Sequence, residues 1–288
     1  ELLTRVGPGT PGGALLRMYW HPISLSREIN KESPTKFVRV LGEDLVIFKD
    51  KSDRFGLIAD KCPHRNASLV YGRVEERGIS CVYHGWLMDC DGNIIETPPE
   101  RNDAIMKNVK TTAYPVQDYL GMIWAYMGPL PVPPMVNYDT LFRADGTRKW
   151  LIHNELHANW FQAMENSMDP AHLQVLHQEF IGRGKTAISS TRGFTDDVES
   201  FDFYITPYGG LMKHRVYVNG MEDAHPVLFP NILRQGASSQ FRVPIDDTHT
   251  MHHRLFFYPT EDGSEPEDSF DPEITFEAPI KEDPTKSH

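Results

Sequence analysis

Two short segments of the sequence each place a cysteine close to a histidine. Cys62 precedes His64, and Cys81 precedes His84, so the two segments contain two of the three cysteines in this 288-residue chain. Thiolate and imidazole groups are the side chains that soft and borderline transition metals prefer. Each segment could therefore close a loop around one metal site.

The mixing of ligand types within each segment bears on which metal is bound. Zinc accepts two thiolates and two imidazoles in a tetrahedron, but zinc fingers usually pair Cys with Cys and His with His. In a Rieske [2Fe-2S] cluster one iron takes both cysteines and the other both histidines, so mixed segments reach both irons. The pattern favours a Rieske cluster over a zinc site or over metal-free cysteines beside surface histidines. Cys90 lies outside both segments and is expected to be a core residue.

A second group of polar residues lies in the segment ENSMDPAHLQVLHQEF, residues 165–180. His172 and His177 are separated by roughly 140° around a helix, so they meet at one ion only if the helix is distorted or ends between them. Asp169 lies on the same helix face as His172 and could bind its second imidazole nitrogen. Alternatively, Asp169 caps a helix that begins at Pro170, and the histidines only pack.

The surrounding sequence predicts an α+β protein in two domains. After an N-terminal segment, residues 1–16, short apolar runs broken by Gly, Asp and Asn predict an antiparallel all-β domain over 17–130. Hairpin turns are expected in LGEDLVIFKD, residues 41–50, and in DCDGNIIE, residues 89–96. The proline-rich stretch 127–139 then marks a domain boundary. Helical periodicity over 159–180 and strand-like runs over 199–259 predict a second domain, residues 131–288, made of an antiparallel sheet plus helices.

The composition excludes several classes of partner. The net charge of −11 argues against nucleic acid or an anionic membrane surface. No apolar run approaches the roughly 18 residues that cross a bilayer, and the first residues lack the features of a secretory signal. With an odd number of cysteines, this favours the cytoplasm. The acidic, proline-containing stretch 259–288 is expected to be a loop or partly ordered tail, and the missing initiator Met suggests that the chain begins within a longer one.

The segments CPHR and CVYHGW resemble the Rieske domain of the aromatic ring-hydroxylating oxygenases. The similarity covers nearly the whole chain and is nearest to the phthalate dioxygenase-like group of alpha, or terminal oxygenase, subunits. It implies that Cys62, His64, Cys81 and His84 hold a [2Fe-2S] cluster. It also implies that a helix-grip, START-like catalytic domain follows the Rieske domain.

The same resemblance implies a mononuclear Fe(II) site in the second domain, with His172 and His177 as ligands. Asp169 is then expected to bridge the iron histidine and His84 of the partner subunit in a homotrimer or stacked trimers. The family's third ligand, a downstream Asp, has no match between Met251 and His288. No carboxylate ligand is therefore assigned, and the second domain is expected to be incomplete at its C-terminus.

The expected function is that of a terminal oxygenase in aromatic hydrocarbon catabolism. A separate NAD(P)H-dependent reductase or ferredoxin would supply electrons, and O2 would dihydroxylate, monohydroxylate or O-demethylate an aromatic acid or aryl ether. A substrate carboxylate calls for an arginine, and Arg234 and Arg192 are the two candidates. The alternatives are a Rieske electron-transfer protein with a ligand-binding domain and no oxygen chemistry, and a zinc-stabilised binding module; iron content separates the three.

Overall fold

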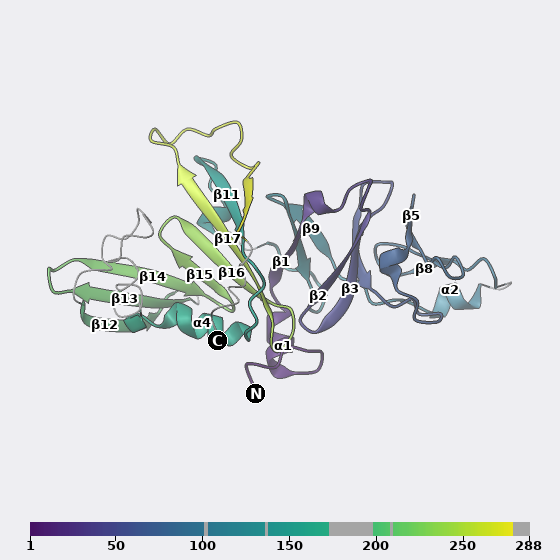
Figure 1. The fold of residues 1–288 in the computed structure, drawn as a ribbon, viewed down its shortest axis with the longest axis horizontal. Coiled ribbons are helices and arrows are strands. Elements are labelled where there is room, and N and C mark those ends of the chain that lie inside the picture. The colour runs from purple at the N-terminus through teal and green to yellow at the C-terminus, as the bar shows by residue number, and fades with distance from the viewer. Residues whose placement is uncertain (101–102, 136–137, 173–197, 208–209, 279–288) are drawn as a thin grey trace, which may run out of the picture. The chain divides into compact units, whose positions relative to one another are not determined.

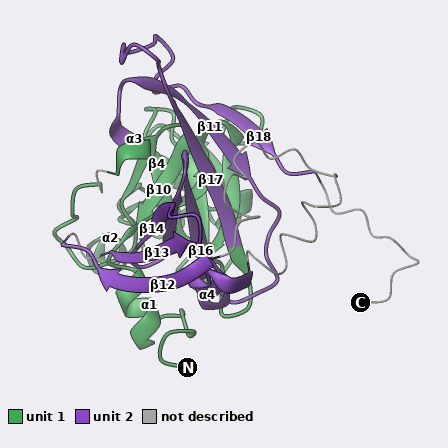
Figure 2. Ribbon diagram, turned by 90° about the vertical axis from the view of Figure 1, so that its left-hand side faces the viewer, with its two compact units in different colours: residues 1–141, 243–250 green, residues 142–242, 251–288 purple. Residues whose placement is uncertain are grey.

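The computed structural model of the 288-residue chain describes residues 1–100, 103–135, 138–172, 198–207 and 210–278 (Figure 1). The chain divides into two compact units, residues 1–141 with 243–250 and residues 142–242 with 251–288 (Figure 2). No helix in the described ranges combines the length and the apolar character needed to cross a bilayer.

The first unit is an all-β body made of three small sheets with short helices between strands. The first sheet has the order β1 (Trp20–Leu25), β10 (Met122–Tyr126), β9 (Val116–Tyr119), and the second β2 (Thr35–Val40), β3 (Glu43–Lys49), β4 (Phe55–Ala59). The third runs β5 (Arg73–Glu75), β6 (Gly78–Ser80), β7 (Leu87–Met88), β8 (Ile94–Glu96). The helical segments are α1 (Pro11–Leu16), η1 (Ser26–Glu28), η2 (Leu69–Tyr71), α2 (Ala104–Asn108) and α3 (Asp139–Phe142), the last ending at the boundary between the units.

Two tight turns fix the register of this unit, and both confirm the hairpins expected from the sequence. Leu41 and Gly42 join β2 to β3 with φ values of 50° and 76°, which is the backbone of a two-residue hairpin turn. Between β7 and β8, the Asp89 carboxylate accepts a hydrogen bond from Asn93 N at 2.8 Å, and Gly92 adopts a φ of 79°. Cys90 is buried beside this second turn, as expected of a core residue.

The second unit contains one large twisted sheet. Within the described residues it has eight strands, in the order β12 (Val198–Ile205), β13 (Leu211–Tyr217), β14 (Glu222–Leu228), β15 (Ile232–Gln235), β16 (Ser238–Pro244), β17 (Thr250–Pro259), β11 (Gly146–Ile152), β18 (Glu273–Phe276). β11 pairs antiparallel with β17 and parallel with β18. The acidic C-terminal stretch is therefore not all loop, because alternating apolar residues in EITF let β18 extend the sheet edge.

The helix α4 (Trp160–Met168) belongs to this second unit. Asn159 caps it by accepting a hydrogen bond from Phe161 N at 3.0 Å. Trp160 and Met164 form its buried stripe. The helix ends at Asp169, whose extended ψ of 114° is the conformation that a following proline favours. An all-β unit followed by a sheet with few helices confirms the expected α+β class.

Candidate active site

The two Cys/His segments form loops with the same backbone hydrogen bonds. In each loop the cysteine N–H donates to the carbonyl five residues later, and the cysteine carbonyl accepts from the N–H four residues later. These bonds, of 2.8 to 2.9 Å, join Cys62 N to Ala67 O, Asn66 N to Cys62 O, Cys81 N to Trp86 O and Gly85 N to Cys81 O. The residue at the fourth position has a positive φ in both loops, 56° at Asn66 and 75° at Gly85, which Asn and Gly adopt more readily than other residues. Local sequence therefore builds two matching loops, one after β4 and one after β6.

The four candidate ligand side chains meet between these loops. Cys62 and Cys81 are 1% and 3% exposed, and the ring centres of His64 and His84 lie 4.6 Å apart. The four side chains line one shared space between the loops. On its far side, Trp86 stacks on His64 with ring centres 4.7 Å apart and planes 6° from parallel. The structure thus brings together all four residues that the sequence singled out.

The chemistry of this donor set fits a Rieske cluster. His64 Nδ1 is buried and has no hydrogen-bond partner among the described residues. Burial raises the pKa of the Cys62 thiol to about 11, and the neighbouring Cys81 acts in the same direction. Two adjacent thiols in a buried site ionise together only when a cationic group compensates their charge. A [2Fe-2S] group with mixed ligands requires thiols and imidazole nitrogens that are available to bind iron. Cys62, Cys81 and His64 Nδ1, which has no partner among the described residues, meet this requirement.

The second group of candidate residues surrounds the C-terminal end of α4. His172 Nδ1 lies 3.3 Å from Asp169 Oδ2, and His172 Nε2 lies 3.4 Å from Asn166 Nδ2. The other carboxylate oxygen of Asp169 accepts a hydrogen bond from Ala171 N at 2.8 Å. Asp169 therefore combines both functions considered from the sequence, because it caps the following turn and also contacts the imidazole. Burial works against its ionisation, but the bond from Ala171 and the neighbouring His172 lower the pKa of Asp169.

A buried lysine anchors the end of α4 to the sheet. Lys213, on β13, is 3% exposed and donates a hydrogen bond from Nζ to Ser167 O at 2.8 Å. This carbonyl lies in the last turn of α4, where backbone oxygens have no partner within the helix. The bond fixes the end of α4, which leads directly to Asp169 and His172. The sequence analysis did not single out Lys213, because a lysine inside an alternating strand gives no sign of its partner.

A cavity of about 420 Å³ lies against the same helix. Gln162 and Asn166 line it from α4, while Arg242 on β16 and His252 on β17 line it from the sheet. All of these residues belong to the second unit. Asn166 also contacts His172, so the candidate iron ligand lies next to a residue that lines the cavity.

Arg234, one of the two arginines chosen from the sequence, is not among the described residues that line this cavity. Arg234 donates from its guanidinium to the carbonyls of Gly236 and Ser238 in its own hairpin. Arg192 and His177 lie outside the described residues. The sequence analysis missed Arg242, although the signal existed: an arginine stands in the middle of the strand-like run SSQFRVP.

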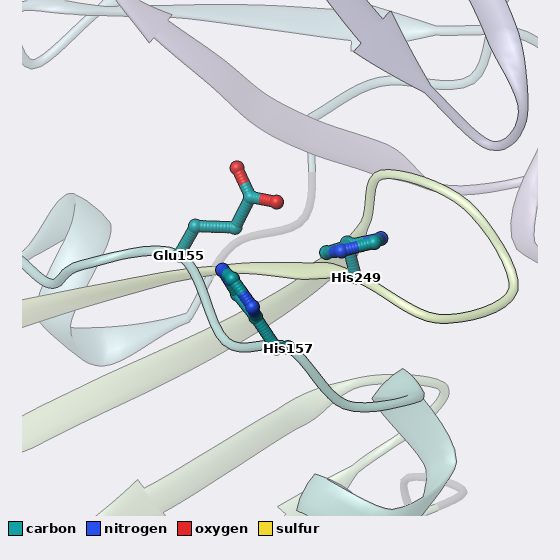
Figure 3. A group of neighbouring side chains, drawn as sticks. All are labelled: Glu155, His157 and His249. Carbon is teal, nitrogen blue, oxygen red and sulfur yellow. The ribbon is translucent and has the colours of Figure 1, made fainter.

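Figure 3 labels three further side chains with atoms that can bind metals, Glu155, His157 and His249. Glu155 and His157 lie on the segment between β11 and α4, in the second unit. His249 lies in the turn between β16 and β17, in the first unit, where its Nδ1 is 3.1 Å from Asp246 Oδ1. Asp246 thus has the turn-forming function that its sequence context indicates. We assign no joint site to side chains that belong to different units.

The comparisons with known proteins agree with these features. Residues 19–117 match the family model described as Rieske [2Fe-2S] domain. The chain is 38% identical over 273 residues to the 5,5'-dehydrodivanillate O-demethylase oxygenase subunit of Sphingobium sp., covering 92% of this chain and 64% of that one. It is 34% identical over 270 residues to the phthalate 4,5-dioxygenase oxygenase subunit of Pseudomonas putida, covering 86% of this chain and 61% of that one.

A solved structure shows the same fold. The reduced complex between oxygenase and ferredoxin in carbazole 1,9a-dioxygenase matches with a TM-score of 0.63 at 19% identity, over 86% of this chain and 72% of that chain. The chain spans less than two thirds of the length of the two curated relatives, 64% and 61%. The comparisons thus show a Rieske [2Fe-2S] domain in the chain, and similarity to oxygenase subunits along most of the chain's length.

Proposed function

We propose that this protein is the terminal oxygenase of a multicomponent Rieske system that acts on an aromatic acid or aryl ether in the cytoplasm. The observation that carries this proposal is the cavity of about 420 Å³ that shares Asn166 with the candidate iron ligand His172. A volume in this range suits a small-molecule ligand. A protein that only carries electrons needs no ligand cavity beside a second metal site. Two of the relatives that the chain resembles are named for carboxylate substrates, dehydrodivanillate and phthalate.

In this proposal the two matching loops hold the [2Fe-2S] cluster through Cys62, His64, Cys81 and His84. When bound, the cluster and a mononuclear Fe(II) supply one-electron transfer and activation of O2. The loops themselves keep the cysteines out of water and leave the histidine side nearer the surface, since Cys62 and Cys81 are buried whereas His64 and His84 are partly exposed.

The iron ligands would be His172 and His177, with a third carboxylate still to be identified. Asp169 contacts the His172 ring at Nδ1, and a metal would bind at Nε2 in exchange for the contact of that atom with Asn166 Nδ2. Lys213 keeps this arrangement in place by fixing the last turn of α4. The protein's contribution is therefore a fixed imidazole at one wall of a cavity.

Asp169 is also suited to a second contact outside its own chain. Its side chain is 47% exposed although one oxygen contacts His172 and the other caps the next turn. A carboxylate has about four acceptor positions, so it can accept a further hydrogen bond. We propose that His84 of the partner subunit donates this bond in a homotrimer or stacked trimers, which would bring the residues that hold the cluster of one subunit next to the residues that would hold the iron of the next.

The electron donor, a reductase or ferredoxin, would bind near the histidine side of the cluster. Tyr83 and Val82 precede His84 and are 61% and 45% exposed. Tyr83 also contacts the His84 ring, with ring centres 3.9 Å apart. Exposed apolar side chains that touch a ligand of the redox group are suited to a transient protein interface.

The test is iron quantitation combined with electron paramagnetic resonance of the dithionite-reduced whole protein and with oxygen uptake. Three irons per chain, a rhombic Rieske signal and substrate-dependent oxygen uptake would support the oxygenase. The same signal with two irons and no uptake would instead support an electron-transfer protein with a ligand-binding domain. A colourless zinc protein would exclude both.

A further inference from the structure

Arg242 is a buried arginine whose guanidinium is not fully paired within the protein. It lies on β16 and is 6% exposed. Its Nε and Nη1 are buried and make no hydrogen bond to any described residue. The side chain nevertheless lines the 420 Å³ cavity. A guanidinium remains charged in proteins, and a buried charge is expensive unless it is paired.

The groups around Arg242 share its sign or are neutral. Burial, followed by the positive charge of Arg254, lowers the pKa of Arg242 to about 10. His252 stacks on His153 with ring centres 3.9 Å apart, and its own Nε2 is buried without a partner among the described residues. Burial, with Arg242 next, lowers the pKa of His252 to about 2, so this ring is neutral at ordinary pH.

The acids nearby do not compensate Arg242. In the described part of the chain, the carboxylate that reaches this group of basic side chains is Glu277, and it pairs with His153, whose Nδ1 is 3.4 Å from Glu277 Oε2. No carboxylate acts on Arg242 within that same part of the chain. A buried positive charge, with two donors that have no acceptor among the described residues, therefore borders a cavity large enough for a ligand.

We propose that Arg242 binds the carboxylate of an aromatic acid in this cavity, with the adjacent His252 Nε2 as a second polar contact. An anion at this position would supply the missing counter-charge and accept the free N–H groups. Arginine forms stronger hydrogen bonds with carboxylates than a neutral group could form there. This inference rests on the proposed function, because it names the substrate class and the recognition residue of the same site.

The position of Arg242 relative to α4 fits this assignment. Asn166 lines the opposite, helical wall of the cavity and lies 3.4 Å from His172 Nε2. A molecule that places its carboxylate on Arg242 can therefore extend its ring toward the candidate iron ligand within one cavity. Arg234 cannot take this role in the same way, because carbonyls of its own hairpin already accept from its guanidinium.

The test is calorimetric titration of the iron-loaded whole protein with matched probes: benzoate, phthalate and 4-methoxybenzoate against benzamide, phthalamide and 4-methoxybenzamide. We expect at least one acid to bind at least about 30-fold more tightly than its amide. This factor is the smallest loss of affinity that is typical when a buried charge is left without its charged partner. Arg242→Met should abolish this preference, and Arg242→Lys should retain part of it. Arg234→Met is the matched control and should bind the acids as the unaltered protein does.

Two results would overturn the inference. In the unaltered protein, equal affinity for acids and amides, or no detectable binding of any acid, would mean that the protein itself neutralises Arg242. An unchanged acid preference in Arg242→Met would place the recognition elsewhere. Because the first comparison needs no variant, it decides the question even if Arg242→Met fails to fold.

The same experiment separates this inference from the proposed function. Binding is measured without turnover, whereas oxygen uptake is measured with 4-methoxybenzoate and with the neutral ether anisole. A clear acid preference lost in Arg242→Met, but no oxygen uptake with any probe, would support carboxylate binding and contradict the oxygenase. Oxygen uptake without any acid preference would support the oxygenase and contradict the assignment of Arg242.

Discussion

Replacing the buried lysine that anchors α4 should change how stability depends on pH. Lys213 donates to Ser167 O at 2.8 Å and is 3% exposed. Burial lowers its pKa to about 8, and Arg215 acts in the same direction, whereas Asp223 and Asp169 raise it. Lys213→Met removes the charge and the hydrogen bond while keeping an unbranched side chain of similar length.

The magnitude follows from the lowered pKa. Between pH 8 and pH 10.5 the unfolded chain binds a proton that the folded chain does not, so the stability of the unaltered protein rises with pH in this window. A pKa lowered from 10.5 to about 8 corresponds to a penalty of about 3 kcal/mol at pH 7, and about 2 kcal/mol of it is relieved by pH 9.5. The Met variant carries no such penalty but leaves Ser167 O without its partner, at a cost of about 1–3 kcal/mol.

These opposing effects predict that the unaltered protein and Lys213→Met have similar free energies of unfolding at pH 7. Between pH 7 and pH 9.5 the difference between them should change by about 2 kcal/mol in favour of the unaltered protein. The assay is urea unfolding followed by tryptophan fluorescence at pH 7, 8 and 9.5. Lys149→Met is the matched control, because Lys149 lies in the same sheet with a side chain one third exposed, 3.0 Å from Glu273. Parallel pH profiles for Lys213→Met and the unaltered protein would refute the reasoning.

Three other changes test the remaining parts of the site. His84→Cys should shift the visible absorption of the cluster and lower its potential, because a thiolate adds negative charge; an unchanged spectrum would exclude His84 as a ligand. Asp169→Asn should leave the iron content intact but slow turnover by at least about 10-fold, and normal turnover would remove its role. Asp223→Asn should lower the free energy of unfolding by about 3–5 kcal/mol, since Arg215 is buried and bonded to this carboxylate; a smaller loss in urea titrations would contradict the pairing. Despite burial, hydrogen bonds hold the pKa of Asp223 well below its usual 3.8, so the unaltered protein should lose this stability as the pH falls below about 4.

The features that the sequence predicted well are those built from neighbouring residues. The Cys62 and Cys81 loops each close through hydrogen bonds that span four or five residues, so spacing alone places the histidines. The Leu41-Gly42 turn is equally local, because its two residues determine the hairpin geometry. Asp169 and His172 meet because they lie three residues apart at the end of a helix.

The features that the sequence did not predict depend on packing between distant segments. Lys213 reaches Ser167 across 46 positions of the chain, and no periodicity within β13 indicates that bond. In β18, four residues join the sheet by pairing with β11, more than a hundred residues earlier. Such pairings are decided by the surface that the rest of the sheet offers, and an acidic tail rich in loop-forming residues hides them.

The comparison of two arginines shows why the proposed substrate-binding residue could not be predicted from the sequence. Arg234 and Arg242 lie on adjacent paired strands, and both interrupt apolar runs. A strand that is buried on one face alternates between apolar and polar residues, and this alternation would show which arginine faces the interior. All seven residues of β16 are buried, however, so alternation carries no information there and the partner of Arg242 cannot be deduced from its neighbours. The three-dimensional structure is needed to show that Arg242 borders a cavity together with α4, and that its Nε and Nη1 have no acceptor among the described residues, which are the two observations behind the proposed carboxylate site.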